Sequence, residues 1–257
     1  MAKILACSDI HNNLRAVRQL RSLEGNDFDA LIVAGDIGSE NTNEVFDLLQ
    51  TFDCPVLYVF GNWDRRLGHR QKFGERCHHI HLSPVAVEGL NVVGESVDGI
   101  DPEWESLRLA NDTGDPIAIA AARRKHIEQQ RTELSTAVNA QRPERTIVVS
   151  HYRLTKTKAF LPDIPLFLFG HIHRFEDTTY RGQRFVNVSA LDKKVIVAKK
   201  GLRAKQVGYR YINDGSYVII THTERTGFAI DPRRFNPDFS GWDRIEGIFS
   251  SSATEVE

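Results

Sequence analysis

Seven side chains that can bind a metal ion follow short apolar runs of the sequence. They are two carboxylates, one amide and four imidazoles: Asp9, His11, Asp36, Asn62, His151, His171 and His173. Each apolar run predicts a buried strand, and open α/β sheets bind their ligands beyond the carboxyl ends of the strands. We therefore expect these residues, although scattered along the chain, to converge on one site.

The mixture of donor types indicates which metals such a site would hold. Nitrogen and oxygen donors together suit Mn, Fe, Zn, Ni or Co better than Ca or a metal that prefers sulfur. Seven ligands are too many for one tetrahedral ion, so the set predicts two ions with a carboxylate between them. The Asp9-Ile10-His11 and His171-Ile172-His173 spacings fit this prediction, because residues i and i+2 of an extended chain point the same way.

The elements that must position these residues alternate along the first part of the chain. Strands are expected at 4–7, 31–34, 55–60, 146–149 and 166–169. Three helices are expected: one at 14–23, one that opens with a capping box at Asn41 and Glu44 and runs to Phe52, and one at about 116–140. Continuous apolar strands separated by helices indicate a parallel sheet covered on both faces. Hairpins are expected at 85–93, around Arg181-Gly182, and between 209–212 and 217–221 with Asn213-Asp214-Gly215 as the turn.

Five blocks of the sequence resemble, in the same order, the motif blocks of the calcineurin-like metallophosphoesterases. They are Ser8-Asp9-Ile10-His11, Gly35-Asp36, Gly61-Asn62-Trp63-Asp64, Ser150-His151 and Gly170-His171-Ile172-His173, and they span about two-thirds of the chain. The resemblance implies an α/β fold, a four-layer αββα sandwich of two mixed β-sheets flanked by helices. We expect one domain over residues 1–257, with a motif core at 3–222 and a C-terminal appendage at about 228–257.

The resemblance also implies a role for each matched residue. Asp9, His11 and His173 would hold one metal ion, Asn62, His151 and His171 the second, and Asp36 would bridge the two. Asp36, Asn62 and His151 are the catalytic residues that this similarity implies. The implied function is hydrolysis of a phosphodiester or a small phosphomonoester by a metal-bound hydroxide, with manganese as the favoured ion.

The sequence departs from the family pattern at Trp63. Most members have a histidine there, which contacts phosphate and is assigned to protonating the leaving group, although some small prokaryotic relatives have Cys instead. Without that acid, leaving groups of low pKa are favoured, unless His69, His78, His79 or His81 replaces it. Trp63 either stacks on a planar group of the substrate or packs at the base of its loop.

Three other features each have two interpretations. Asn12 either contacts a phosphate oxygen, which with Trp63 makes it a candidate substrate contact, or caps the following helix. Asp64, which orients the missing histidine in the family, caps a helix or pairs with Arg65 or Arg66. The histidine tract at 77–81 is interpreted as a solvated strand edge rather than a metal site. The 116–140 helix, inserted between the third and fourth blocks, is a candidate roof for the site.

Composition limits the remaining classes of function. The chain has 257 residues and a net charge of −1, so we expect no nonspecific binding to nucleic acid. Three Cys do not make a disulfide framework, and the N-terminal apolar run is too short for a signal peptide or a membrane span. We expect a cytoplasmic enzyme that acts on a small phosphorylated substrate such as a nucleotide. The alternatives are a scaffold that has lost catalysis, and a protein phosphatase or nuclease of the same family.

Overall fold

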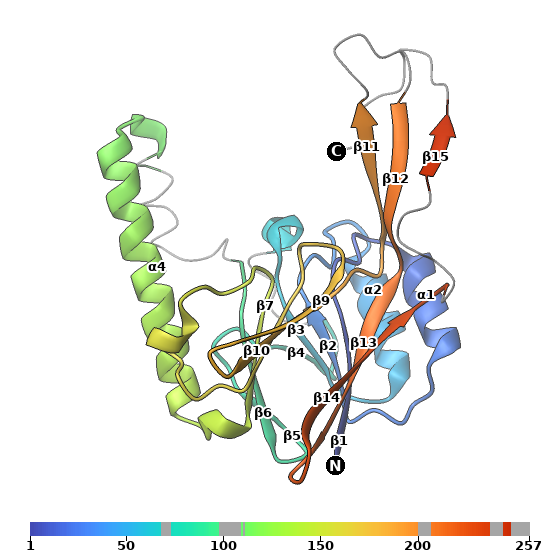
Figure 1. The fold of residues 1–257 in the computed structure, drawn as a ribbon, viewed down its shortest axis with the longest axis horizontal. Coiled ribbons are helices and arrows are strands. Elements are labelled where there is room, and N and C mark those ends of the chain that lie inside the picture. Colours follow the sequence, from blue (N-terminus) through green and yellow to red (C-terminus); the bar gives the residue numbers. More distant parts are fainter. Residues whose placement is uncertain (68–72, 98–108, 110, 200–206, 237–243, 248–257) are drawn as a thin grey trace.

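The computed structural model of the chain describes residues 1–67, 73–97, 109, 111–199, 207–236 and 244–247 (Figure 1). Within these residues the helices are α1 (Leu14–Leu23), α2 (Thr42–Leu49) and α4 (Pro116–Asn139), with short 3-10 helices at Gln50–Phe52, Asn62–Leu67, Pro143–Arg145 and Thr157–Ala159. The strands are β1 (Ala2–Cys7), β2 (Ala30–Ala34), β3 (Val56–Val59), β4 (Cys77–His79), β5 (Val85–Val87), β6 (Leu90–Glu95), β7 (Thr146–Ser150), β8 (Leu166–Phe169), β9 (Phe175–Tyr180), β10 (Gln183–Val188), β11 (Lys193–Lys199), β12 (Val207–Asp214), β13 (Ser216–Thr223), β14 (Gly227–Arg234) and β15 (Arg244–Gly247).

Two mixed sheets form the body of the described chain. The first has the strand order β14-β13-β1-β2-β3-β4, and the second has the order β5-β6-β7-β8-β10-β9. In the first sheet β1 to β4 are parallel, while β13 and β14 extend it antiparallel at one side. In the second sheet β6, β7, β8 and β10 are parallel, with an antiparallel strand at each edge. The strands predicted before the candidate ligands are therefore confirmed.

The two sheets pack face to face, and helices cover their outer faces. Alternate residues of a strand point to opposite faces, so β1 places Ile4 in the core between the sheets and Leu5 in the core beneath α1 and α2. A third core holds Leu134 of α4 against the outer face of the second sheet. The order of helices, sheet, sheet and helix is the four-layer αββα sandwich that the family resemblance implies (Figure 1).

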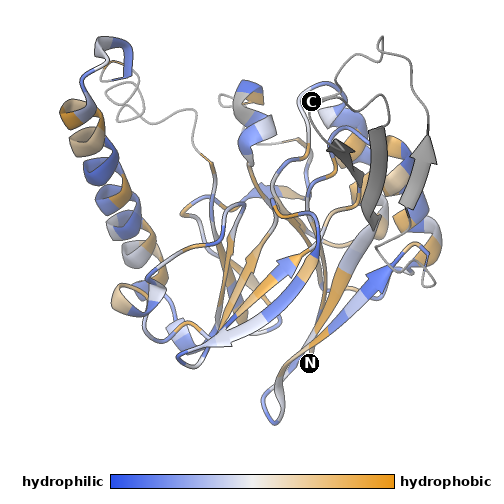
Figure 2. Ribbon diagram, turned by 45° about the horizontal axis from the view of Figure 1, so that its top comes forward, coloured by the Kyte–Doolittle hydropathy of each residue, from blue (hydrophilic) through white to orange (hydrophobic). Residues whose placement is uncertain are grey.

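The helix α4 is held at its C-terminal end. Its buried residues are Leu134 and Val138, and its N-terminal half extends away from the sheets (Figure 1). Figure 2 shows apolar residues concentrated on the strands, whereas α4 carries a mixture of hydrophilic and apolar side chains. Among the described helices, none is long and apolar enough to cross a membrane.

The later part of the fold differs from the prediction. Instead of forming a hairpin with β13 around Asn213-Asp214-Gly215, β12 pairs with β11 and β15 in a separate three-stranded sheet. The reason is that β13 lies between β1 and β14, so both of its edges are already paired. Gly227–Arg234, which overlaps the start of the appendage expected from about residue 228, is the edge strand β14 of the first sheet. Residues 237–243 and 248–257 of that expected appendage lie outside the described residues.

The expected capping box at the start of α2 is also wrong. The side chain of Asn41 makes no capping hydrogen bond, and the helix begins at Thr42. The Thr42 hydroxyl instead donates to the carbonyl of Gly38 at 2.6 Å, and the backbone N–H of Asn41 donates to the side chain of Asn12. Contacts between loops therefore hold this helix start.

Candidate metal centre

The candidate ligands gather where neighbouring parallel strands end. Asp9 and His11 follow β1, Asp36 follows β2, Asn62 follows β3, His151 follows β7, and His171 and His173 follow β8. Their potential ligand atoms form two groups, each within 4.8 Å: Asp9, His11 and His173 in the first, and Asp36, His151 and His171 in the second. The structure thus brings together the residues that the strand ends predict to converge.

The loops that carry these residues are not extended, contrary to the expectation for the Asp-x-His and His-x-His spacings. Five candidate ligands have a positive φ: Asp9 at 50°, His11 at 49°, Asp36 at 54°, His171 at 71° and His173 at 56°. This left-handed conformation is uncommon outside glycine and costs about 1–3 kcal/mol for each residue. Hydrogen bonds between loops offset that cost: the N–H groups of Ile10 and His11 both donate to the Asp36 carbonyl, at 2.8 and 3.0 Å. Because the His171–His173 segment is not extended, these two side chains do not point the same way, and they lie in different ligand groups.

In the first group, the buried carboxylate of Asp9 presents its two oxygens differently. Oδ2 accepts hydrogen bonds from the Ser8 hydroxyl at 2.5 Å and from the backbone N–H of His171 at 2.9 Å. Oδ1 lies 3.0 Å from Nε2 of His173 and 3.8 Å from Nε2 of His11. One oxygen is therefore fixed by donors, and the other faces two imidazole nitrogens.

In the second group, the tautomer of His151 follows from its backbone contact. Nδ1 lies 3.0 Å from the carbonyl of Ala34, so Nδ1 carries a proton and donates it to that oxygen. Nε2 lies 3.0 Å from Oδ1 of Asn62 and 3.3 Å from Oδ2 of Asp36. Two oxygen acceptors facing one imidazole nitrogen require a cation between them, either a proton or a metal ion.

Asp36 lies between the two groups. Its Oδ2 is 3.3 Å from Nε2 of His11 and 3.3 Å from Nε2 of His151. Its Oδ1 accepts the backbone N–H of Trp63 at 2.8 Å, which fixes the orientation of the carboxylate. An oxygen at equal distance from an imidazole of each group is well placed for a ligand shared by two ions.

Burial and charge shift the pKa values of these groups in opposite directions. Burial alone would raise the pKa values of Asp9 and Asp36, but the neighbouring imidazoles outweigh it and hold both pKa values below the usual range. For the imidazole of His11 burial acts in the other direction and would lower the pKa, but the carboxylates of Asp192 and Asp36 outweigh it and raise that pKa to about 9. The pKa of His151 is also raised, because Asp36 outweighs burial. The carboxylates thus favour positive charge at this site, which a divalent cation can supply in place of protons.

Two glycines allow the ligand loops to approach one another closely. A Cβ atom at Gly61 would lie 2.1 Å from Oδ1 of Asp36, and one at Gly170 would lie 2.8 Å from Oδ2 of Asp9. Both distances are shorter than any normal contact of a Cβ atom, so a larger residue at either position would displace a candidate ligand. The glycine that precedes Asn62 and the one that precedes His171 are therefore part of the site's packing.

The residues of the site fit divalent metal ions. Within the described residues, Oδ1 of Asp9 is buried without a hydrogen-bond partner, and it is the oxygen that faces His11 and His173. An unpaired buried oxygen is costly unless a cation or a donor satisfies it. The surrounding donors are carboxylate oxygens, an amide oxygen and imidazole nitrogens, which suit Mn, Fe, Zn, Ni or Co.

The two predicted substrate contacts, Trp63 and Asn12, both have partners within the protein. The indole of Trp63 stacks on the imidazole of His11, although 47% of the residue remains exposed. Oδ1 of Asn12 accepts the backbone N–H groups of Glu40 and Asn41, at 2.9 and 3.0 Å. Asn13, not Asn12, caps α1. A contact of Trp63 or Asn12 with substrate stays a prediction.

The sequence interpretation missed the role of Asp64. Its buried carboxylate accepts the backbone N–H groups of Gly61 at 2.7 Å, Gly38 at 2.8 Å and Ile37 at 3.2 Å. It therefore ties the loop of Asn62 to the loop of Asp36, a role that neither a helix cap nor an arginine partner anticipates. Burial raises the pKa of Asp64 to about 6.

Asp192 is a second carboxylate that the sequence interpretation missed. Its Oδ2 lies 3.6 Å from Nδ1 of His11, and its Oδ1 accepts the side-chain N–H of Asn13 at 2.7 Å. Its backbone N–H donates to the carbonyl of Asp9 at 3.1 Å. A carboxylate behind a metal-binding histidine orients the ring and raises its basicity. No strand-end motif marks Asp192 in the sequence, because a long-range contact alone brings it to the site.

Two histidines of the tract, His79 and His81, are packed rather than solvated, contrary to prediction, whereas His78 is exposed. His79 stacks on Tyr58 with ring centroids 5.3 Å apart, and its Nε2 lies 2.7 Å from the hydroxyl of Ser96. Nδ1 of His81 accepts the backbone N–H of Ser96 at 3.1 Å. The reason is that β4, although an edge strand, ends against the second sheet, where a bridge joins His81 to Gly94. His69, which is also a candidate for the missing acid, lies outside the described residues.

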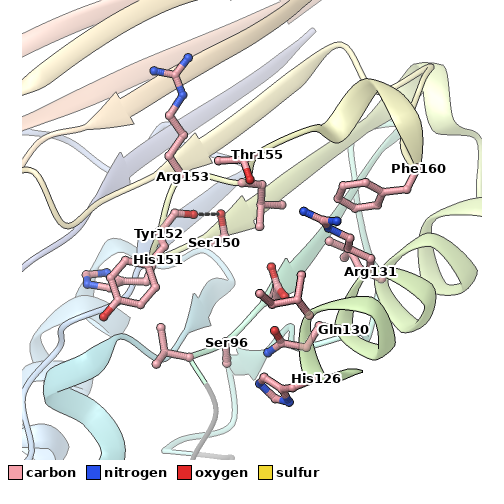
Figure 3. Close-up of a pocket in the computed structure, with 15 residues that line it drawn as sticks. Ser96, His126, Gln130, Arg131, Ser150, His151, Tyr152, Arg153, Thr155 and Phe160 are labelled. Carbon is pink, nitrogen blue, oxygen red and sulfur yellow. Dashed lines mark hydrogen bonds between the residues drawn. The ribbon is translucent and has the colours of Figure 1, made fainter. Parts of the chain in front are cut away.

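The helix α4 does line a space next to the centre. A cavity beside His151 is lined by α4 residues together with the segment that follows β7 (Figure 3). The sequence makes this helix a candidate roof for the site, and the structure places its residues in the lining of the cavity beside His151.

Comparisons with known proteins add to this description. The sequence matches the family model of the calcineurin-like phosphoesterase superfamily domain over residues 2–196. A search of curated proteins finds no match. The solved structure of TT1561 from Thermus thermophilus is similar, with a TM-score of 0.52 and 15% identity over 91% of this chain and 99% of that one. At this identity the likeness supports the fold alone.

Two further solved structures are less similar. Phosphopantetheinyl hydrolase from Mycobacterium tuberculosis has a TM-score of 0.43 and 17% identity over 74% of this chain and 89% of that one. An archaeal phosphodiesterase has a TM-score of 0.46 and 12% identity over 90% of this chain and 99% of that one.

Proposed function

The chain belongs to the calcineurin-like phosphoesterase superfamily, whose domain model matches residues 2–196, and we propose that it is a metal-dependent phosphoesterase with a dinuclear centre. One observation carries this proposal. Oδ2 of Asp36 lies 3.3 Å from an imidazole nitrogen of each ligand group, which suits a carboxylate that bridges two ions. A protein that served only as a scaffold has no need to keep two such groups.

Each ion has its own set of ligands in this proposal. Asp9, His11 and His173 hold one divalent ion, Asn62, His151 and His171 hold the second, and Asp36 is shared. When bound, the two ions lower the pKa of a water molecule and neutralise the charge that develops on phosphorus. Manganese is the favoured ion, and iron, zinc, nickel and cobalt suit the same donors.

The protein's other residues keep these ligands in position. The Ala34 carbonyl fixes the tautomer of His151, and the hydroxyl of Tyr152 donates to Oδ1 of Asn62 at 3.1 Å. Asp64 and Asp192 hold the loops and the His11 ring from behind. A site organised before substrate arrives needs little reorganisation during the reaction.

Trp63 narrows the range of substrates. An indole N–H does not transfer a proton to an alkoxide leaving group, so this position supplies no general acid. We therefore expect esters with leaving groups of low pKa to react fastest. We place the enzyme in the cytoplasm and its substrate among small phosphodiesters or phosphomonoesters.

The test is hydrolysis of bis(4-nitrophenyl) phosphate by protein that has been stripped of metal and reloaded with manganese. We expect hydrolysis that a chelator abolishes and manganese restores, with one solvent oxygen entering the phosphate-side product in labelled water. A scaffold would bind manganese without hydrolysing this ester or any other phosphate ester. A phosphate-side product without solvent oxygen would contradict attack of water at phosphorus and would indicate cleavage of the C–O bond instead.

A further inference from the structure

A cavity of about 470 Å³ lies beside the second ligand group. Figure 3 shows His126, Gln130 and Arg131 of α4 on one side of it, across from His151 and Tyr152. His151 both lines this cavity and belongs to the second ligand group. The cavity is therefore next to the place where the proposed function holds the phosphoryl group.

The size and lining of the cavity suit an organic group rather than an inorganic ion. Cavities of about 300–1,000 Å³ with mainly apolar walls are typical sites for small ligands. Here Ile127 and Leu134 of α4, Leu154, and the rings of Tyr152 and Phe160 supply apolar surface. A phosphate group alone would leave most of this surface in contact with water.

Tyr152 connects the cavity with the ligand group. Its hydroxyl donates to Oδ1 of Asn62, and its ring lies edge-on to His171 with centroids 4.5 Å apart. The residue is 41% exposed, so part of it is accessible to a ligand. A ring bound in the cavity can therefore contact Tyr152 while a phosphoryl group attached to that ring reaches the metal ligands.

Polar groups on the walls indicate what the edge of such a ring must offer. Among the described residues, Arg131 makes no ion pair with a carboxylate, and its guanidinium lies 5.4 Å from the centroid of the Phe160 ring. Arg131 therefore brings N–H donors to the cavity lining that bind no carboxylate of the described residues. Gln130 adds a donor and an acceptor. Donors and acceptors beside aromatic rings match a planar heterocycle that has a polar edge.

We propose that this cavity binds the organic group of the substrate, and that this group is a planar heterocycle with a hydrogen-bonding edge, as in a nucleoside. The inference rests on the proposed function, because the phosphoryl group must be held at the adjacent ligand groups. It makes α4, which the chain inserts between Asn62 and His151, the element that selects the substrate.

Two pairs of variants on α4 separate this cavity from the rest of the helix. Ile127→Trp adds bulk at the cavity wall, and Ile117→Trp adds the same bulk on the same helix outside the cavity, where the residue is 81% exposed. Arg131→Met removes one of the two arginines that line the cavity, the one carried by α4, and Arg124→Met removes an exposed cation of α4 that does not line it.

Calorimetric titration with phosphonates, which cannot be hydrolysed, separates binding from catalysis. The manganese-loaded protein is titrated with the methylene phosphonate analogues of adenosine and uridine monophosphate, with benzylphosphonate and with ethylphosphonate. We expect the tighter nucleoside analogue to bind about tenfold more tightly than ethylphosphonate, since a stacked base contributes about that factor, and benzylphosphonate to lie between them. Ile127→Trp and Arg131→Met should each remove most of this advantage, while Ile117→Trp and Arg124→Met should keep it.

Several results would overturn the inference. Equal Kd values for the nucleoside analogues and ethylphosphonate would exclude the cavity from binding, as would an advantage that persists in both cavity variants. Benzylphosphonate binding as tightly as the nucleoside analogues would exclude the polar edge. If the phosphonates are discriminated as expected but no ester is hydrolysed, the cavity assignment stands and the proposed hydrolysis fails. Hydrolysis without discrimination would instead support the proposed function and overturn the cavity assignment.

Discussion

The indole ring of Trp63 stacks on the imidazole of His11, with ring centroids 4.7 Å apart and planes inclined by 20°. The backbone N–H of the same residue donates to Oδ1 of Asp36 at 2.8 Å. Trp63 therefore contacts two candidate ligands, one through its side chain and one through its backbone. The residue that stands where most of the family has histidine is thus placed to hold two candidate ligands in position.

We predict that Trp63→Ala weakens metal binding by about two- to tenfold, because loss of a stacked ring frees His11. Trp63→Phe should restore most of the affinity, since a phenyl ring can stack in the same place. Manganese titration followed by calorimetry measures both variants. Wild-type affinity in Trp63→Ala would contradict the positioning role. If Trp63 also stacks on substrate, the loss of kcat/KM will be larger for a nucleotide ester than for an aliphatic one.

Asp36→Asn should be the most damaging single substitution. An amide offers one neutral oxygen in place of a charged carboxylate, so neither ion is held as before and no bridge remains. We expect reduced metal content and a loss of kcat/KM larger than about 100-fold, with the fold preserved by circular dichroism. Full metal content and turnover in this variant would refute the bridging role.

Asp64→Asn tests a residue that holds the loops without touching the metal. The carboxylate accepts the backbone N–H groups of Gly61, Ile37 and Gly38 with its two oxygens. An amide keeps one oxygen as acceptor, but its NH2 group is a donor and cannot accept the N–H groups that the second oxygen binds. We predict metal affinity about 10–100-fold weaker, as for other groups behind metal ligands. Asp163→Asn, at an exposed position, is the control and should leave affinity unchanged. Equal affinities in the two variants would remove Asp64 from the site.

His79 should make the stability of the metal-free protein depend on pH. Burial beside Tyr58, together with the charge of His81, lowers the pKa of His79 from 6.5 to about 4. Between those two pH values the unfolded chain binds a proton that the folded chain does not, so stability falls as pH falls from 6.5 toward 4. We predict a smaller drop of Tm between pH 7.5 and 5 in His79→Phe than in wild type. The exposed neighbour variant His78→Phe should behave as wild type, and identical drops in all three proteins would contradict the prediction.

The sequence was sufficient to predict which strands precede the ligands and that their ends converge. Buried strands such as β7 and β8 are continuous apolar runs, and a parallel arrangement places their ends together. The sequence was not sufficient to predict the backbone conformation of the loops that carry the ligands. Asp9 and His11 are left-handed because their loop is hydrogen-bonded to the loop of Asp36, a contact between segments far apart in sequence.

The same limit explains the other errors. Asp192 reaches His11 from a distant segment, and His79 is partly buried between Tyr58 of the adjacent strand and Ser96, which follows β6 of the second sheet. The turn signal at Asn213-Asp214-Gly215 was genuine as a break between strands, and Gly215 has a φ of +77°. It did not make a hairpin, because β13 had already paired on both sides. Local patterns define elements, whereas competition between partners decides which elements pair.

Electron paramagnetic resonance of the manganese-loaded protein tests the dinuclear centre most directly. Two manganese ions that shared Asp36 as a ligand would be coupled magnetically, and we predict the multiline spectrum of a coupled pair with two ions bound to each chain. The spectrum should revert to that of isolated ions in Asp36→Asn. A wild-type spectrum of isolated manganese only, at saturating metal, would contradict the shared site.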